Sequence, residues 1–153
     1  MINNKGEIVE LYRKLHLFDV DTPDFKFRES KLVKAGNTVG QPVETIIGKI
    51  GLQIVSNLQF TFMNCSKILT ISDIFLLHFQ CYDIRFAESS LILAQSGAEI
   101  LTYPSAFAFS TGTAHWDILN RCRAIENQCY VISAAQIGNH NAKRKSYGHA
   151  VSF

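Results

Sequence analysis

Residues 81–88 read Cys-Tyr-Asp-Ile-Arg-Phe-Ala-Glu, and they are the most informative part of the sequence. Residues 88–96 are predicted to form a short helix that ends before Gly97, because glycine readily adopts the left-handed backbone needed there. Backbone N–H groups and the dipole at a helix start stabilise a thiolate. Cys81 is therefore a candidate nucleophile, although a cysteine with no other mark is more often a buried core residue.

The residues around this cysteine resemble a known family. Tyr-Asp-Ile-Arg-Phe after Cys81 is similar in type and order to the nucleophile turn of the carbon–nitrogen hydrolase (nitrilase) superfamily, and residues 101–107 (Leu-Thr-Tyr-Pro-Ser-Ala-Phe) follow at a fitting distance. Residues 12–19 (Tyr-Arg-Lys-Leu-His-Leu-Phe-Asp) resemble the strand that carries the family's catalytic lysine. The resemblance implies amide hydrolysis through a cysteine thioester, with no metal or organic cofactor.

The resemblance also implies roles for individual residues. Cys81 attacks the amide, while Lys14 and the backbone N–H of Tyr82 stabilise the oxyanion of the tetrahedral intermediate. Glu29 resembles a second active-site glutamate that helps to position the lysine. The alternatives are an exposed lysine on a strand edge and an ordinary loop carboxylate.

Three further residues are candidates for the substrate pocket, namely Arg85, Phe107 and Thr111. Arg85 could pair with a substrate carboxylate, and a hydroxyl on the loop after Phe107 could assist it. A structural ion pair between Arg85 and Glu88 is the alternative. Residues 147–149 (Tyr-Gly-His) match a family turn that is expected at the rim of the site.

Alternating strands and helices predict an α/β fold, and the resemblance implies part of the four-layer α-β-β-α sandwich of nitrilases. The clearest predicted helix covers residues 116–127, and His115-Trp116 resembles its start. One face of this helix carries apolar residues at helical spacing and is expected to be buried: Ile118, Leu119, Cys122 and Ile125.

The predicted strands vary in length and burial. Residues 129–135 form a near-continuous apolar run, expected to be covered on both faces, so Cys129 is placed in the core with Cys122. Other strands are predicted at residues 7–17, 45–54 and 99–103, with a turn near Gly48 and Lys49 in the second of them.

The resemblance is to the Nit branch, which includes deaminated glutathione amidases and, in some animals, domains fused to a Fhit-type nucleotide hydrolase. It covers residues 2–54 and 81–150. The family carries its general-base glutamate on a strand before the lysine, whereas only Glu7 and Glu10 precede Lys14 here and neither matches. Residues 1–153 are therefore expected to be a single incomplete domain, without the opening and closing strands.

Residues 55–80 separate Gly-Leu-Gln-Ile (51–54) from Cys81, which the family joins directly. Val55-Ser56 can be encoded by GTAAGT, a splice donor, and Phe79-Gln80 by TTTCAG, a splice acceptor. Removing residues 55–80 restores the family motif, and Val151-Ser152 permits a second donor. We interpret the insert as a translated intron, and the alternative is a lineage-specific loop.

Composition sets further limits. With 47% hydrophobic and 18% charged residues, the 153-residue chain is expected to have a packed core, and a net charge of +2 gives no argument for nucleic acid. The cysteines and histidines show no metal-ligand spacing. Polar residues interrupt the apolar stretch 60–79, and no signal peptide is visible, so we expect no membrane span and a cytoplasmic location, with a mitochondrial form possible for the intact protein.

The expected function is hydrolysis of a small amide, deaminated glutathione or a similar ω-amide, by an enzyme that is a homo-oligomer when intact. A general ω-amidase of 2-oxo-acid amides is the nearest alternative. These 153 residues alone are expected to be poorly soluble and inactive, because sheet edges and apolar surface are left uncovered. A non-catalytic fragment that docks on full-length subunits is the second class of function, and a redox thiol protein is a remote third.

Overall fold

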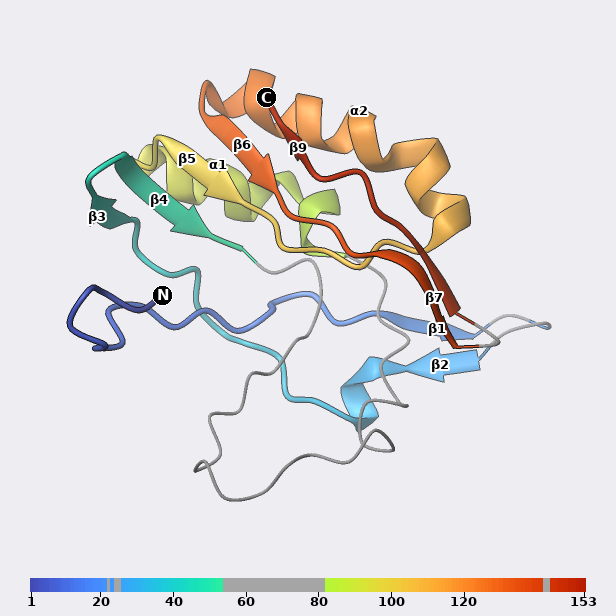
Figure 1. Ribbon diagram of the computed structural model, residues 1–153. Coiled ribbons are helices and arrows are strands. Elements are labelled where there is room, and N and C mark those ends of the chain that lie inside the picture. The colour runs from blue at the N-terminus through green and yellow to red at the C-terminus, as the bar shows by residue number, and fades with distance from the viewer. Residues whose placement is uncertain (22, 24–25, 54–81, 142–143) are drawn as a thin grey trace.

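A mixed five-stranded sheet forms the centre of the computed structural model, which describes residues 1–21, 23, 26–53, 82–141 and 144–153 (Figure 1). The strand order is β3-β4-β5-β6-β9. The strands are β3 (Val43–Thr45), β4 (Gly48–Leu52), β5 (Ile100–Thr102), β6 (Tyr130–Ser133) and β9 (Val151–Ser152). The inner pairs β4–β5 and β5–β6 are parallel, and the two edge strands are antiparallel to their neighbours.

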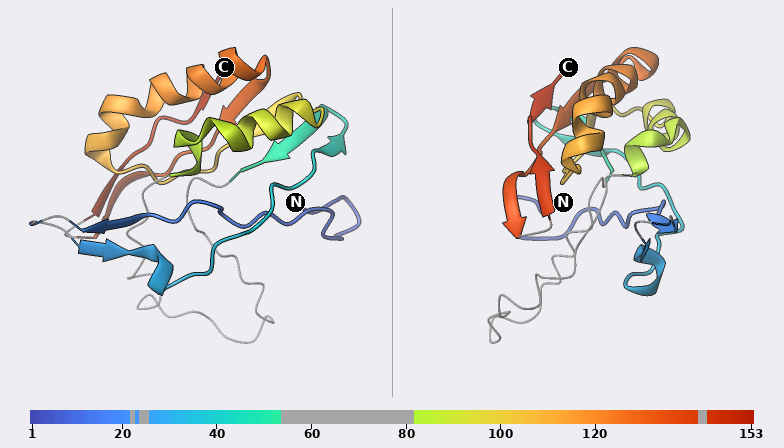
Figure 2. Two further views of the ribbon diagram at one scale, coloured as in Figure 1. Left: turned by 180° about the vertical axis from the view of Figure 1, so that it is seen from behind. Right: turned by 90° about the vertical axis from the view of Figure 1, so that its right-hand side faces the viewer.

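Two helices lie on one face of this sheet, as Figure 2 shows. Helix α1 (Ala87–Gln95) precedes β5, and helix α2 (Phe109–Asn127) connects β5 to β6. A parallel pair of strands needs a long crossover connection, and α2 supplies it. The predicted α/β fold is therefore confirmed. Cys81 and the predicted insert at residues 55–80 lie outside the described residues.

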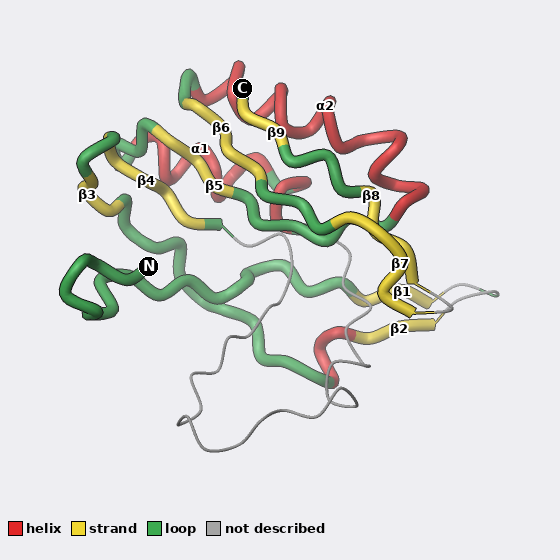
Figure 3. The backbone as a smooth tube through the Cα atoms, viewed as in Figure 1, coloured by secondary structure: helices red, strands yellow, loops and turns green. Residues whose placement is uncertain are grey.

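The first forty residues are mostly loop (Figure 3). They contain the short antiparallel pair β1 (Asp19–Asp21) and β2 (Lys26–Arg28), followed by a 3-10 turn η1 (Glu29–Lys31). The predicted strand at residues 7–17 is wrong, because none of these residues is in a strand and only Ile8 makes a β-bridge, an isolated one to Ile2. Another antiparallel hairpin, β7 (Ile137–Asn141) and β8 (Arg144–Tyr147), precedes β9.

The predictions around α1 and β5 are confirmed within one or two residues. Gly97 follows the end of α1 with a φ of 93°, the left-handed backbone that its position predicted. The segment predicted as one strand at residues 45–54 is instead a hairpin, in which Ile46 and Ile47 form the turn between β3 and β4. Gly48 therefore opens β4 instead of forming the turn.

Of the apolar stripe predicted on α2, Leu119 is half-buried and packs against the core, but the other three members are exposed. Ile118 and Ile125 are 68% and 70% exposed, and Cys122 is exposed as well, so the prediction of a buried Cys122 is wrong. The buried residues of α2 are Gly112, Trp116, Asn120 and Arg123. The apolar pattern of the sequence did not identify this face, because two of its residues, Asn120 and Arg123, are polar. Both make hydrogen bonds in the interior. Asn120 accepts a hydrogen bond from the Ser133 hydroxyl, and Arg123 Nε donates to the Ile84 carbonyl at 2.8 Å.

Strand β6 is covered on one face only by the described residues. Val131 and Ser133 are buried against the helices, while Tyr130 is 71% and Ile132 is 44% exposed on the opposite face. The expected burial of this strand on both faces is therefore wrong for these residues. Cys129, just before β6, is half-buried, its Sγ lies 3.0 Å from the Ala98 carbonyl, and burial raises the pKa of its thiol.

Candidate active site

Lys14 and Glu29 form a buried ion pair. Lys14 Nζ lies 2.7 Å from Glu29 Oε2, and the two side chains are 1% and 0% exposed. The same carboxylate oxygen accepts the backbone N–H of Phe18 at 2.5 Å, and the Glu29 N–H donates to the Phe18 carbonyl at 3.2 Å. The structure thus brings the predicted lysine and its predicted positioning glutamate together, and neither is an exposed surface side chain.

The main chain of Lys14 is held as well. Its carbonyl accepts the N–H of Gly36 at 2.8 Å. A Cβ at position 36 would lie 2.4 Å from the Arg13 carbonyl oxygen, closer than any side chain can come. Glycine at this position therefore permits the close approach of the two segments, and Lys14 is fixed at both its side chain and its backbone.

Asp83, two residues after Cys81, is fully buried and accepts hydrogen bonds from three residues that flank Lys14. Oδ1 accepts the His16 backbone N–H at 2.8 Å and lies 3.0 Å from His16 Nδ1, while Oδ2 accepts the Tyr12 hydroxyl at 2.9 Å and the Leu15 N–H at 3.3 Å. Sequence reasoning did not assign Asp83 a role. Its position inside the nucleophile motif is the only local signal, since its partners are 67–71 residues away in the chain.

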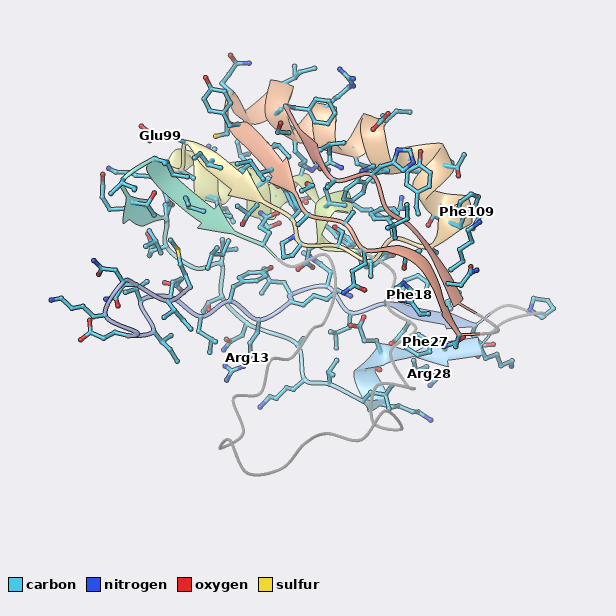
Figure 4. All side chains as sticks on the ribbon, in the orientation of Figure 1. Arg13, Phe18, Phe27, Arg28, Glu99 and Phe109 are labelled. Carbon is cyan, nitrogen blue, oxygen red and sulfur yellow. The ribbon has the colours of Figure 1, made fainter. Side chains whose placement is uncertain are left out.

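Aromatic rings gather beside this cluster. The His16 imidazole stacks on the Phe86 ring with centroids 3.7 Å apart, and Tyr82 meets Phe18 and Phe86 edge-on at 5.5 and 5.1 Å. The ring centroids of Phe18 and Phe27 lie 6.4 Å apart; both side chains are labelled in Figure 4. Tyr82 is half-buried, and an oxyanion role for its backbone N–H stays a prediction.

Arg85 and Phe107 are brought together on the helix side. The guanidinium of Arg85 lies 5.6 Å from the centre of the Phe107 ring, and its Nη2 lies 3.2 Å from His115 Nδ1. The Phe107 ring is buried and packs edge-on against Trp116 at 5.1 Å. His115 and Trp116 lie well inside α2, which begins at Phe109, so they do not start the helix as predicted.

Thr111 lies in the first turn of α2 and not on a loop, which corrects its predicted setting. Its hydroxyl donates to the Ala108 carbonyl at 3.4 Å. Residues 147–149, predicted to form a turn at the rim, have left-handed backbones at Gly148 and His149. The stacked rings of Tyr147 and His149 lie 4.2 Å apart.

A buried polar network fixes the end of β4 against α1. Gln53 Nε2 donates to the Ser89 hydroxyl at 3.2 Å, its Oε1 accepts the Ser90 hydroxyl at 3.3 Å, and Ser90 Oγ lies 2.6 Å from the Tyr103 hydroxyl. Burial raises the pKa of Tyr103, so its hydroxyl stays protonated over the ordinary pH range. Gln53 is the last described residue before Cys81, and this network holds it in place. Tyr82, which follows Cys81, is held by its ring contacts with Phe18 and Phe86.

The part of the chain that the structure describes contains no group of three His, Cys, Asp or Glu side chains that could hold a metal ion. None of its helices has the length and apolar character needed to cross a bilayer.

Comparison with known proteins identifies relatives of this chain. A model of the Carbon-nitrogen hydrolase family matches residues 1–61 and 78–153, so the unmatched residues 62–77 fall within the predicted insert. The chain is 49% identical over 152 residues to deaminated glutathione amidase of Mus musculus, covering 99% of this chain and 39% of that protein. It is 47% identical over 151 residues to the nitrilase and fragile histidine triad fusion protein NitFhit of Drosophila melanogaster, covering 99% of this chain and 27% of that protein.

A solved structure supports the same assignment. The crystal structure of the Caenorhabditis elegans NitFhit protein superposes with a TM-score of 0.78 at 43% identity, covering 99% of this chain and 31% of that one. The chain therefore spans between about a quarter and two-fifths of the length of these relatives. On its matched residues, its fold and its similarity to Nit-branch proteins, the chain belongs to the carbon–nitrogen hydrolase family.

Proposed function

We propose that the protein hydrolyses the carbon–nitrogen bond of a small amide, with Cys81 as the nucleophile. The observation that carries this proposal is the buried Lys14–Glu29 pair, which the bonds of Asp83 tie to the segment that immediately follows Cys81. A lysine with almost no solvent exposure must give up the hydration of its ammonium group, and pairing with a carboxylate often does no more than offset that free-energy cost. Stability alone therefore does not explain the pair. It is well suited to stabilising negative charge that develops beside it.

In the proposed reaction, the Cys81 thiolate attacks the amide carbonyl and forms a tetrahedral intermediate. Glu29 engages one N–H of the Lys14 ammonium, which has three donors, so the others can donate to the oxyanion together with the Tyr82 N–H. The carbon–nitrogen bond then breaks, and the nitrogen leaves as ammonia with the proton that the Cys81 thiol gave up to the general-base glutamate of the full-length protein. Water attacks the thioester, so an amide and a water molecule give a carboxylic acid and ammonia.

The proposed substrate is deaminated glutathione or a similar ω-amide. Support comes from the mouse, rat, human and bovine relatives, which are deaminated glutathione amidases 47–49% identical to this chain. Arg85, within the nucleophile turn, is the proposed partner of a substrate carboxylate. A general ω-amidase acting on 2-oxo-acid amides would use the same chemistry.

Ammonia release tests this proposal directly. The assay compares two substrates, deaminated glutathione and a 2-oxo-acid ω-amide. Each is tested with the 153-residue chain and with a version that lacks residues 55–80. Both sequences are also tested within a full-length family protein that supplies a general-base glutamate. We expect turnover only in the full-length context and only without the insert, with a preference for deaminated glutathione. Cys81→Ala should abolish it, whereas Cys122→Ser, at an exposed cysteine, should not. Turnover that survives Cys81→Ala would refute the mechanism.

A non-catalytic role as a docking fragment is favoured by a separate observation. Large apolar side chains are exposed on two sides of the molecule, Ile118 and Ile125 on α2 and Tyr130 and Ile132 on β6. Under this alternative, the chain would co-purify with a full-length subunit of the same family and would elute alone as aggregate. A monodisperse, catalytically active chain would exclude it.

A further inference from the structure

We propose that Asp83 is a positioning residue of the hydrolase site, because its carboxylate fixes the lysine-bearing segment against the nucleophile turn and so sets the place of Lys14 relative to Cys81. This inference rests on the proposed function for its catalytic meaning, but its structural part can be tested separately. The residues concerned, here called the Asp83 cluster, are Tyr12, Leu15, His16 and Asp83.

The geometry of the cluster uses the whole hydrogen-bonding capacity of a carboxylate. Each oxygen of Asp83 contacts two groups: Oδ1 accepts the His16 backbone N–H and lies beside the ring nitrogen Nδ1, and Oδ2 accepts the Tyr12 hydroxyl and the Leu15 N–H. An ionised carboxylate has about four acceptor positions, whereas an asparagine offers acceptors at one atom only. An asparagine at position 83 would therefore turn an NH2 group towards a backbone N–H in either orientation of its amide.

The cluster acts on Lys14 without touching it. Its members lie on both sides of Lys14 in the chain, while the lysine itself is bound by Glu29 at the side chain and by Gly36 at the carbonyl. Loss of the Asp83 carboxylate would thus leave the charge and the ion pair of Lys14 unchanged but would release its segment from the nucleophile turn. A displacement of about 1 Å in a reacting group can cost roughly a hundredfold in rate.

The reactivity of the Cys81 thiol gives a readout that needs no amide turnover. The 153-residue chain is treated with iodoacetamide, and labelling of the Cys81 peptide is followed by mass spectrometry relative to the exposed Cys122. We expect Lys14→Ala and Asp83→Asn each to slow labelling of Cys81 by about tenfold or more, because a nearby cation favours the thiolate. If Asp83 acts through Lys14, the double variant is no slower than Lys14→Ala alone, and multiplied effects would overturn the proposal.

Hydrogen exchange separates positioning from general destabilisation. In Asp83→Asn, the amides of Leu15 and His16 should lose protection, while the Gly36 amide, bonded to the Lys14 carbonyl, should keep it. Equal loss at all three amides would mean that Asp83 supports the fold only. If Asp83→Asn fails to fold, Tyr12→Phe removes a single bond from the cluster and should slow labelling about threefold; no change in labelling would refute the inference.

The two proposals fail in different ways. If the full-length protein hydrolyses no amide while the labelling pattern holds, the proposed function is wrong and the positioning role of Asp83 stands. If amides are hydrolysed and Asp83→Asn labels and turns over like the wild type, the positioning role is wrong and the function stands.

Discussion

Replacing Glu29 by glutamine tests how strongly the buried ion pair couples the site to the fold. Glutamine keeps the volume of the side chain and one carbonyl oxygen that can accept from Lys14 Nζ and the Phe18 N–H, but it removes the negative charge. Lys14, 1% exposed, would then carry a buried charge without a counter-charge.

The size of the effect follows from this burial. Breaking a buried pair by removing one partner costs about 3–5 kcal/mol, and the hydrogen bonds that glutamine retains place Glu29→Gln near the lower end, about 3 kcal/mol. For a chain of this length, each kcal/mol corresponds to roughly 2–4 °C in Tm, so Tm should fall by about 6–12 °C. Glu44→Gln is the matched control, because Glu44 pairs with Lys49 at 3.6 Å on the surface and should cost about 0–1 kcal/mol.

Urea unfolding followed by the fluorescence of Trp116, the single tryptophan of the chain and a fully buried one, measures these changes. The double variant Lys14→Met/Glu29→Gln should recover much of the loss, since it removes both charges while filling similar volume. A loss below about 1 kcal/mol for Glu29→Gln, or a double variant less stable than the single one, would refute the reasoning.

Three other predictions concern the surroundings of the site and α2. Gly36→Ala should cost more than about 1 kcal/mol in urea unfolding, because its Cβ would meet the Arg13 carbonyl oxygen at 2.4 Å. Burial and the neighbouring Asp83 raise the pKa of Tyr12, so ionisation of this tyrosine favours the unfolded chain. The stability that the protonated Tyr12 contributes should be complete below about pH 10 and be lost as the pH rises further. Tyr12→Phe should therefore flatten the loss of stability at alkaline pH. Ile118→Asn should change the free energy of unfolding by less than about 0.5 kcal/mol, since the side chain is 68% exposed, and a loss of several kcal/mol would show that it is covered in solution.

Local signals in the sequence predicted local structure well. Helix α1, the left-handed Gly97 and strand β5 depend on residues close together in the chain, and each was found near its predicted place. The buried face of α2 could not be predicted in this way, because Asn120 and Arg123 are buried through bonds to Ser133 and Ile84. An apolar pattern identifies a buried face only where hydrophobic burial is the dominant contribution.

The site shows the same division between local and distant information. The resemblance of the motifs predicted Lys14 and Glu29, and the structure pairs them, although no strand forms around the lysine. Asp83 was missed because its importance lies in contacts with residues 12–16, which no local pattern connects to it. The contacts that surround this buried carboxylate become visible only when the two segments are placed together.

The long sequence separation of the Asp83 bonds also bears on the order in which the molecule folds. A contact between residues 67–71 positions apart forms only after a large loop has closed, so the segment around Lys14 is expected to dock after helix α1 and the sheet strands beside it have formed. Interactions made after the rate-limiting step change the unfolding rate and leave the refolding rate nearly constant. Substitutions at Tyr12 and Asp83 should therefore accelerate unfolding with little effect on refolding, so the chemically important part of the molecule is assembled last and released first.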